Sequence, residues 1–182
     1  MTLLDAFIRY DVPRFARSKM MNRLARMTAD AFGTAPPEMG GLGAVSALQR
    51  YALFTREEVS RIAGDPARTA AVQERLYRAS AATALSYRRL LGVTHWEAAA
   101  AVARRFYGYI GIDMNATPRG DVTFSSCAFS RYYTPETCAV VSALDSGMIA
   151  GLAGEGDLTF SSRITEGAPC CRACFRYRRP QR

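Results

Sequence analysis

Residues 122–129, Val-Thr-Phe-Ser-Ser-Cys-Ala-Phe, decide the fold class that we predict for this chain of 182 residues. Along this stretch the even-numbered residues, which include Val122 and Phe124, form one set that would share a face of an extended chain, and the odd-numbered residues form the set on the other face. A period of two residues is typical of a β-strand. Before this stretch, from Thr2 to about Ile112, the apolar residues have the helical spacing of about 3.6. We therefore expect a helical part, residues 1–112, followed by a part with strands, residues 113–182.

A helix and a hairpin are expected after this first strand. Thr134-Pro135-Glu136 has the residue types of a helix start, and the helix should run to about Ala153. Alternation returns in residues 158–164 and, after a tight loop, in residues 171–177. Two extended segments joined by a short loop predict an antiparallel hairpin. Turn residues are expected to precede the first strand: Asn115, Pro118 and Gly120.

Helix boundaries in the first part follow from capping patterns. Asp65-Pro66 predicts a helix start, and the apolar stripe after it supports a long helix that ends at Gly92. Thr55-Arg-Glu-Glu58 and Thr94-His-Trp-Glu97 have the capping-box pattern and predict two further starts. The remaining expected elements are helices over residues 3–10 and 13–32 and a loop over residues 35–43.

These elements predict an α+β fold. The helical N-terminal half should pack on one face of a small antiparallel sheet, which the strand, helix and hairpin of the C-terminal half contribute. A chain of this length hides enough surface for one core, so we expect residues 1–182 to form a single domain. The helix after Thr134 also has small side chains along one side, and we expect a homodimer, because symmetric pairs are the commonest oligomers.

Charge and composition argue against several functional classes. The formal net charge is +8, but Lys19 is the only lysine among 24 cations and the arginines are spread through the helical segments, so we expect no nucleic-acid partner. Acidic residues interrupt the apolar N-terminus and no long apolar window follows, so we expect no signal peptide, no membrane partner and a cytoplasmic protein. The five cysteines then indicate reduced thiols.

The segment Cys170-Cys171-Arg-Ala-Cys174 resembles a metal-ligand cluster, but the expected strand geometry argues against a metal site. Cys170 and Cys171 would point to opposite faces, and Cys170 and Cys174 would lie about 13 Å apart along one face. Zinc needs sulfur ligands about 2.3 Å from one centre. The chain has one histidine, His95, expected to be exposed beside a helix N-cap. We therefore expect no metal, and because neither a Walker loop nor a dinucleotide fingerprint is present, we expect no other cofactor.

Asp145 is the candidate catalytic residue. Three polar residues fall on one stripe of the helix after Thr134, beside an apolar ridge: Cys138, Ser142 and Asp145. A carboxylate at the border of a core is paired, hydrogen-bonded or functional, and Asp145 would face the thiol of Cys127 or Cys171 in an acid–base arrangement. The alternative is a structural Asp145, bonded to a backbone amide or to an arginine such as Arg163. Four tyrosines either line a pocket or fill the core, and we expect the core: Tyr107, Tyr109, Tyr132 and Tyr133.

Three motifs follow one another between Val122 and Tyr177. They are Phe124-Ser-Ser-Cys127 with aromatics at Phe129 and Tyr132, Leu144-Asp145 in the predicted helix, and Phe160-Ser-Ser-Arg-Ile-Thr-Glu-Gly167 ahead of Cys171. By these motifs the C-terminal half resembles the L-2-amino-thiazoline-4-carboxylic acid hydrolase family. Ser142 stands where members of that family usually have a cysteine.

This resemblance implies an enzyme that opens a small five-membered ring by hydrolysis. Such a reaction needs a base or a thiolate, a donor for the leaving atom and a cation for the substrate carboxylate. The implied catalytic residues are Asp145, Cys127 and Cys171, and the implied substrate-binding residues are Arg163, Ser142 and Tyr132, in a pocket between the C-terminal helix and the sheet. We expect a small-molecule substrate from secondary metabolism. Two alternatives stay open, a cyclase or isomerase of natural-product biosynthesis on the same scaffold and a ligand-binding module without catalysis.

Overall fold

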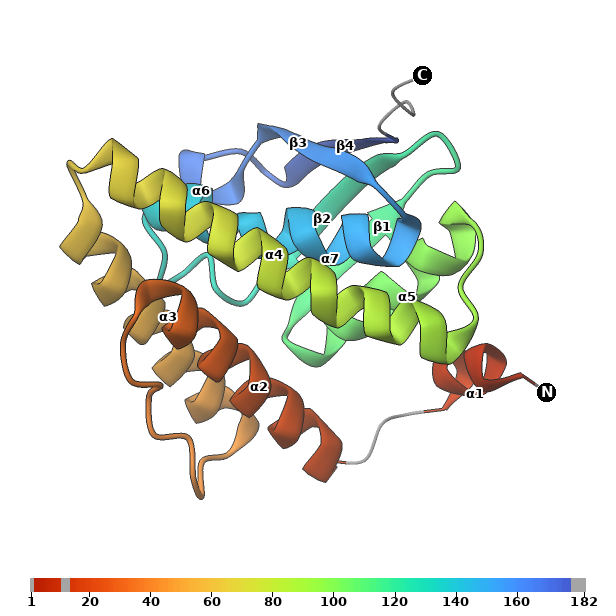
Figure 1. Ribbon diagram of the computed structural model, residues 1–182, viewed down its shortest axis with the longest axis horizontal. Helices are drawn as coiled ribbons and strands as arrows, with labels where there is room; N and C mark the ends of the chain where they lie inside the picture. Colours follow the sequence, from red (N-terminus) through yellow and green to blue (C-terminus); the bar gives the residue numbers. More distant parts are fainter. Residues whose placement is uncertain (1, 11–13, 178–182) are drawn as a thin grey trace.

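Five helices form the N-terminal part of the structure (Figure 1). The computed structural model describes residues 2–10 and 14–177, so the start predicted at Pro13 lies outside the described residues. Within them the helices are α1 (Leu3–Arg9), α2 (Arg14–Phe32), α3 (Ala44–Ile62), α4 (Pro66–Leu91) and α5 (Trp96–Tyr109). The start predicted at Asp65 is confirmed, because its carboxylate accepts a hydrogen bond of 2.9 Å from the backbone N–H of Arg68. Helix α4 ends at Gly92, as predicted, and this glycine adopts the left-handed conformation.

Of the two predicted capping boxes, one lies inside a helix and the other lies one residue ahead of the N-cap that the structure shows. Thr55 lies inside α3, and its hydroxyl bonds the backbone carbonyl of Tyr51 at 3.1 Å and lies 2.8 Å from the hydroxyl of Tyr133. The buried face of α3 runs through Thr55 from Tyr51 to Ile62, so burial on both sides outweighs the local capping pattern. In α5 the N-cap is His95, one residue later than predicted, and no side chain caps that end. His95 is exposed, as expected.

Four antiparallel strands form one sheet in the order β1-β2-β4-β3: β1 (Ile112–Ala116), β2 (Asp121–Cys127), β3 (Gly156–Ser162) and β4 (Cys171–Tyr177). The predicted first strand is β2, and the predicted hairpin is β3 with β4, where Leu158 pairs with Phe175. The prediction that residues before β2 form only a turn is wrong. Asn115 pairs with Thr123 as part of β1, and the turn is confined to residues 117–120. The signal is present in the sequence, because Ile-Asp-Met-Asn-Ala alternates apolar and polar residues over the five positions of β1.

The helix predicted from Thr134 to Ala153 is two helices, α6 (Pro135–Val141) and α7 (Ala143–Ala153). Its predicted start is confirmed, since the Thr134 hydroxyl accepts a hydrogen bond from the backbone N–H of Thr137. The break falls at Ser142, whose hydroxyl donates to the carbonyl of Ala139 at 2.9 Å. Such local bonds from serine compete with the helical ladder.

Helix α7 lies at the centre of the structure, and α4 crosses it at close range (Figure 1). At Gly147 and Gly151 of α7, the backbone carbonyls of Tyr77 and Ala81 of α4 occupy the space that a side chain would need. By length and composition the segment Pro135–Ala153 could cross a membrane, but more than half of it is buried inside the protein. That burial is typical of a core helix.

The inner face of the sheet is covered by α5 and α7. Trp96 of α5 stacks on Phe175 of β4 with ring centroids 5.1 Å apart, and Ser146 of α7 donates to the carbonyl of Leu158 in β3. Along β4 the buried side chains Cys171, Ala173 and Phe175 alternate with more exposed ones, as predicted. The predicted α+β fold, with helices on one face of a small antiparallel sheet, is therefore confirmed.

Candidate active site

A cavity of about 160 Å³ lies between the helices of the N-terminal part and the region of α6, α7, β1 and the end of β2. An apolar cavity of similar volume holds a benzene-sized ring. The wall comes from eight elements, α2 to α5, β1, β2, α6 and α7, and from residues in the loops between them. Most of it is apolar or aromatic: Met20, Leu24, Met27, Tyr87, Phe106, Ile110, Ile112, Phe129, Val141, Leu144 and Met148. A small, largely apolar molecule is the ligand that such a wall fits.

Asp145 contributes the one carboxylate in this wall, as far as the described part of the chain extends. It lies in the first turn of α7, where the positive end of the helix dipole favours a negative charge. The hydroxyl of Tyr107, from the last turn of α5, donates a hydrogen bond of 2.9 Å to its Oδ1. Tyr107 is itself held by the edge-on contact of its ring with Phe124 of β2, at 5.3 Å between centroids. Three elements thus fix the carboxylate in one orientation.

Burial governs the ionisation of this pair. It raises the pKa of Asp145 from 3.8 to about 6, although the Tyr107 hydrogen bond and the charge of Arg163 both lower it. Burial, and then the charge of Asp145, raise the pKa of Tyr107 well above its ordinary 10, so the phenol stays a donor. A carboxyl with a pKa about one unit below neutral can accept and release a proton at physiological pH, which is what acid–base catalysis requires.

Two thiols share the cavity with Asp145, those of Cys127 and Cys138. Burial raises the pKa of Cys127 from 9.0 to about 12, and burial also raises the pKa of Cys138. A thiol acts as a nucleophile only as its thiolate, and a negative carboxylate nearby disfavours that form further. At neutral pH both side chains therefore behave as small, weakly polar parts of the wall.

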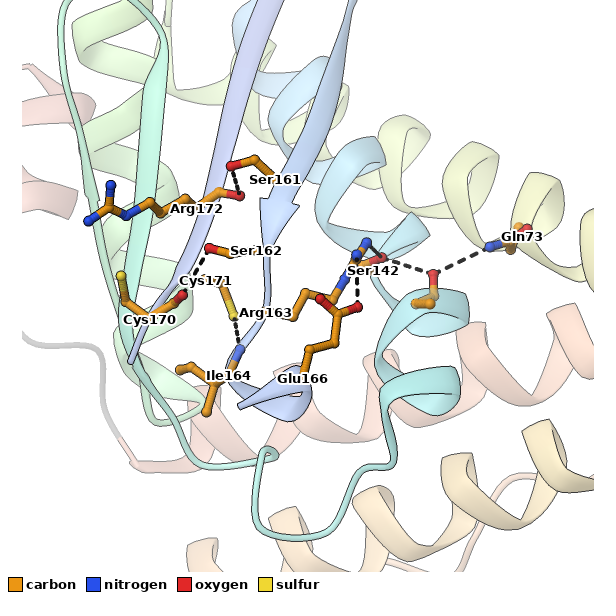
Figure 2. Close-up of polar contacts among 11 residues, drawn as sticks. Gln73, Ser142, Ser161, Ser162, Arg163, Ile164, Glu166, Cys170, Cys171 and Arg172 are labelled. Atoms are coloured by element: carbon orange, nitrogen blue, oxygen red, sulfur yellow. Dashed lines mark hydrogen bonds and ion pairs between the residues drawn. The ribbon is translucent and has the colours of Figure 1, made fainter. Parts of the chain in front are cut away.

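Three of the six residues expected in the site line this cavity: Asp145, Cys127 and Ser142. Cys171 does not, because it faces inward from β4 at a different place, and its sulfur accepts a hydrogen bond of 3.3 Å from the backbone N–H of Ile164 (Figure 2). The hairpin strands β3 and β4 contribute no residue to the wall. The expected pocket between C-terminal helix and sheet is thus formed instead by α6, α7, β1, β2 and the N-terminal helices.

Arg163 also lies outside the cavity wall and is engaged by its neighbours. Its guanidinium lies over the ring of Phe160 at 4.7 Å. It also donates to the Ser142 hydroxyl at 3.4 Å and pairs with Glu166 at 3.6 Å (Figure 2). The alternative in which Asp145 is bonded directly to Arg163 does not hold, since its partner is Tyr107. Arg163 influences Asp145 through charge at a distance, which lowers the pKa of the carboxyl.

Tyr132 is half-buried but does not line the cavity, whereas its neighbour Tyr133 does. Tyr107 and Tyr133 pack in the core with bonded hydroxyls, as expected, and they also line the cavity, as does Tyr51. The signal for Tyr107 is present in the sequence, because it lies on the buried stripe of α5 and a buried phenol needs a partner. That partner is 38 residues further along the chain, so local periodicity does not identify it.

All five cysteines are free thiols. Across residues 2–10 and 14–177, His, Cys, Asp and Glu side chains form no group of three or more that could hold a metal ion. No protein-family model matches the chain, and no curated protein sequence matches it significantly. The resemblance of residues 122–177 to L-2-amino-thiazoline-4-carboxylic acid hydrolases stays a prediction from the motifs quoted above.

Proposed function

We propose that this protein is a small-molecule enzyme in which Asp145 moves a proton on a largely apolar substrate, as an isomerase or cyclase does. The observation that carries the proposal is the pairing of Asp145 with Tyr107 inside an otherwise apolar cavity. A desolvated carboxylate in an apolar wall is a stronger base than one in water, and a fixed donor beside it holds it in place.

The proposed reaction needs no co-reactant. Oδ1 of Asp145 accepts the Tyr107 hydroxyl, and within the described residues no hydrogen bond reaches Oδ2. Oδ2 would take a proton from one atom of the substrate, and the carboxylic acid would return it to another atom of the same molecule. The electron pair left behind shifts a double bond or closes a ring, so product and substrate have the same composition. Tyr107 stabilises the charged form of the base throughout.

Hydrolysis of the kind that the resemblance implies is a second candidate, and Arg23 favours it. Its side chain lines the cavity and is the cation that a substrate carboxylate would need. In this version Asp145 would activate water. Neither of the two cysteines that the resemblance implies would be the nucleophile, because the pKa of Cys127 is about 12 and Cys171 lies outside the cavity wall. The two candidates share the same base and differ in whether water is consumed.

Ring opening of nitrobenzisoxazole tests the proposal without knowledge of the natural substrate. A base removes the proton on the ring carbon, the N–O bond breaks, and a coloured cyanonitrophenolate forms. We expect the wild-type protein to accelerate this reaction and D145N to abolish the acceleration while its circular dichroism spectrum is unchanged. C127A is the matched control and should stay active. Equal rates for D145N and wild type would contradict an acid–base role for Asp145 and would favour the alternative of a ligand-binding module without catalysis.

A further inference from the structure

A second hollow, between α2 and α4, adjoins the cavity and has the opposite character. It measures about 770 Å³ and is lined mostly by polar and charged side chains, of which four are cations and one is an anion: Lys19, Arg23, Arg26, Arg75 and Asp30. Lys19, Arg23, Arg26 and Asp30 recur every three or four residues of α2, so they lie along one side of that helix. We refer to this hollow as the α2–α4 groove.

The groove and the cavity meet at one place. Arg23, Met27 and Thr83 line both of them. These side chains also contact one another, since the Arg23 guanidinium donates to the Thr83 hydroxyl at 3.4 Å and that hydroxyl lies 3.9 Å from the Met27 sulfur. A molecule that extends from the cavity into the groove would therefore pass this cluster.

The charges of the two spaces suit different ends of one molecule. An anion inside the cavity would share it with the Asp145 carboxylate, and among the described residues the one cation in the wall is Arg23, at the junction with the groove. The groove offers Arg23 and Arg26 close to the junction, and in the described part of the chain no carboxylate forms an ion pair with either of them. Asp30 lies seven residues from Arg23, which is about 10 Å along the helix, but only four residues from Arg26, so Arg23 is the cation of the two that lies further from this carboxylate.

We infer that the substrate is an amphipathic anion, whose apolar end occupies the cavity while its carboxylate or phosphate lies in the α2–α4 groove against Arg23 and Arg26. This inference rests on the proposed function, because it assigns the substrate class of that site. The neutral bond from Arg23 to Thr83 at 3.4 Å is long, and a charge-assisted bond to an anion would replace it readily. Arg75 is already engaged, since its Nε donates to the carbonyl of Ala31 at 2.6 Å.

Calorimetric titration of the full chain with three matched ligands tests the inference: phenylbutanoate, phenylbutyl phosphate and the neutral phenylbutanol. Each has a benzene ring for the cavity and a four-carbon chain, of which the last carbon is the carboxyl carbon in phenylbutanoate, so their affinities differ mainly through the head group. We expect at least one anion to bind about tenfold more tightly than the alcohol, since a hydrogen bond to a charged group contributes at least about 1.5 kcal/mol. The tighter of the two anions then identifies the class, carboxylate or phosphate.

Variants assign the effect to the groove. R23Q combined with R26Q should remove the preference for the anion, measured as the ratio of anion to phenylbutanol affinity. R89Q is the matched control, because Arg89 is an exposed residue of α4 that lines neither space. This variant should keep the preference for the anion. Equal binding of anions and alcohol by the wild type, binding of none of them, or an unaltered preference in the double variant would overturn the inference. These readouts do not depend on Asp145 chemistry, so activity lost in D145N with the anion preference intact separates the two proposals.

Discussion

The phenol of Tyr107 on α5 donates a hydrogen bond of 2.9 Å to Oδ1 of Asp145 on α7, within a cavity whose remaining wall is mostly apolar. The two residues come from different halves of the chain, so packing of the helical part on the C-terminal part assembles the pair. Burial raises the pKa of the Asp145 carboxyl and the hydrogen bond from Tyr107 lowers it, so a change at Tyr107 should be measurable as a change in the pKa of Asp145.

Replacement of Tyr107 by Phe should raise the pKa of Asp145 above about 6, because the hydrogen bond that favours the carboxylate is lost. Ring opening of nitrobenzisoxazole depends on the ionised base, so the pH of its half-maximal rate should move upward in Y107F. Y177F is the control, since Tyr177 is exposed on β4 and far from the cavity wall. A pH–rate profile identical to that of wild type would show that the phenol does not act on the carboxyl.

Replacement of Asp145 by Asn should stabilise the protein at neutral pH. The pKa of Asp145 is raised from 3.8 to about 6 on folding, so the folded state binds the proton more tightly. The contribution of Asp145 to stability is then present at and below about pH 4 and is lost as the pH rises through about 6. The loss is on the order of 2–3 kcal/mol, from about 1.4 kcal/mol per unit of pKa.

Urea unfolding of D145N and wild type across this range measures the effect. The stability advantage of D145N should be greatest at neutral pH and shrink as the pH falls to about 4. A D145N variant less stable than wild type at neutral pH would indicate that the carboxylate is well solvated or directly paired.

Alkylation separates the thiols from the base. With a pKa of about 12, the Cys127 thiol should react with iodoacetamide at neutral pH far more slowly than an ordinary cysteine, as followed by mass spectrometry of the peptide that contains it. C127A should also keep its rate with nitrobenzisoxazole within about threefold of wild type, since the residue only fills the wall. Rapid alkylation together with an inactive C127A would assign the chemistry to the thiol instead.

The contact between α4 and α7 is tested with two glycines in different environments. G147A should destabilise the protein by about 1–3 kcal/mol, because a methyl group there meets the carbonyl of Tyr77 and would force the helices apart. Gly108 of α5 faces open space, and G108A should stabilise the protein by about 0.5–1 kcal/mol through helix propensity alone. Thermal unfolding shows whether each variant is more or less stable than wild type. A G147A variant more stable than wild type would contradict the close approach of α4 to α7.

Much of the fold follows from local patterns in the sequence. Period-two alternation locates β2, β3 and β4, and the pair Asp65-Pro66 with Gly92 delimits α4, because these signals need only residues close in sequence. Local patterns mislead where burial overrides them. The threonine of a capping box, Thr55, lies in the middle of α3, where its hydroxyl bonds the preceding turn.

The candidate site is less accessible to sequence reasoning. An aspartate beside an apolar ridge indicates that Asp145 faces inward, and it does line the cavity. Its partner comes from α5, and the cavity wall comes from eight elements and the loops between them, and periodicity does not determine how these come together. For the same reason the sequence does not show that Arg163, within the motif of residues 160–167, and Cys171, at the start of β4, make their contacts outside the cavity wall.

Isotope-edited NMR titration of the Asp145 carboxyl carbon in the intact protein, assigned with D145N, is the most direct test of the acid–base role. Burial predicts a midpoint near pH 6, and Y107F should move it higher. A midpoint near the ordinary value of 3.8 would contradict the account, because such a carboxylate would be solvated and fully ionised at neutral pH.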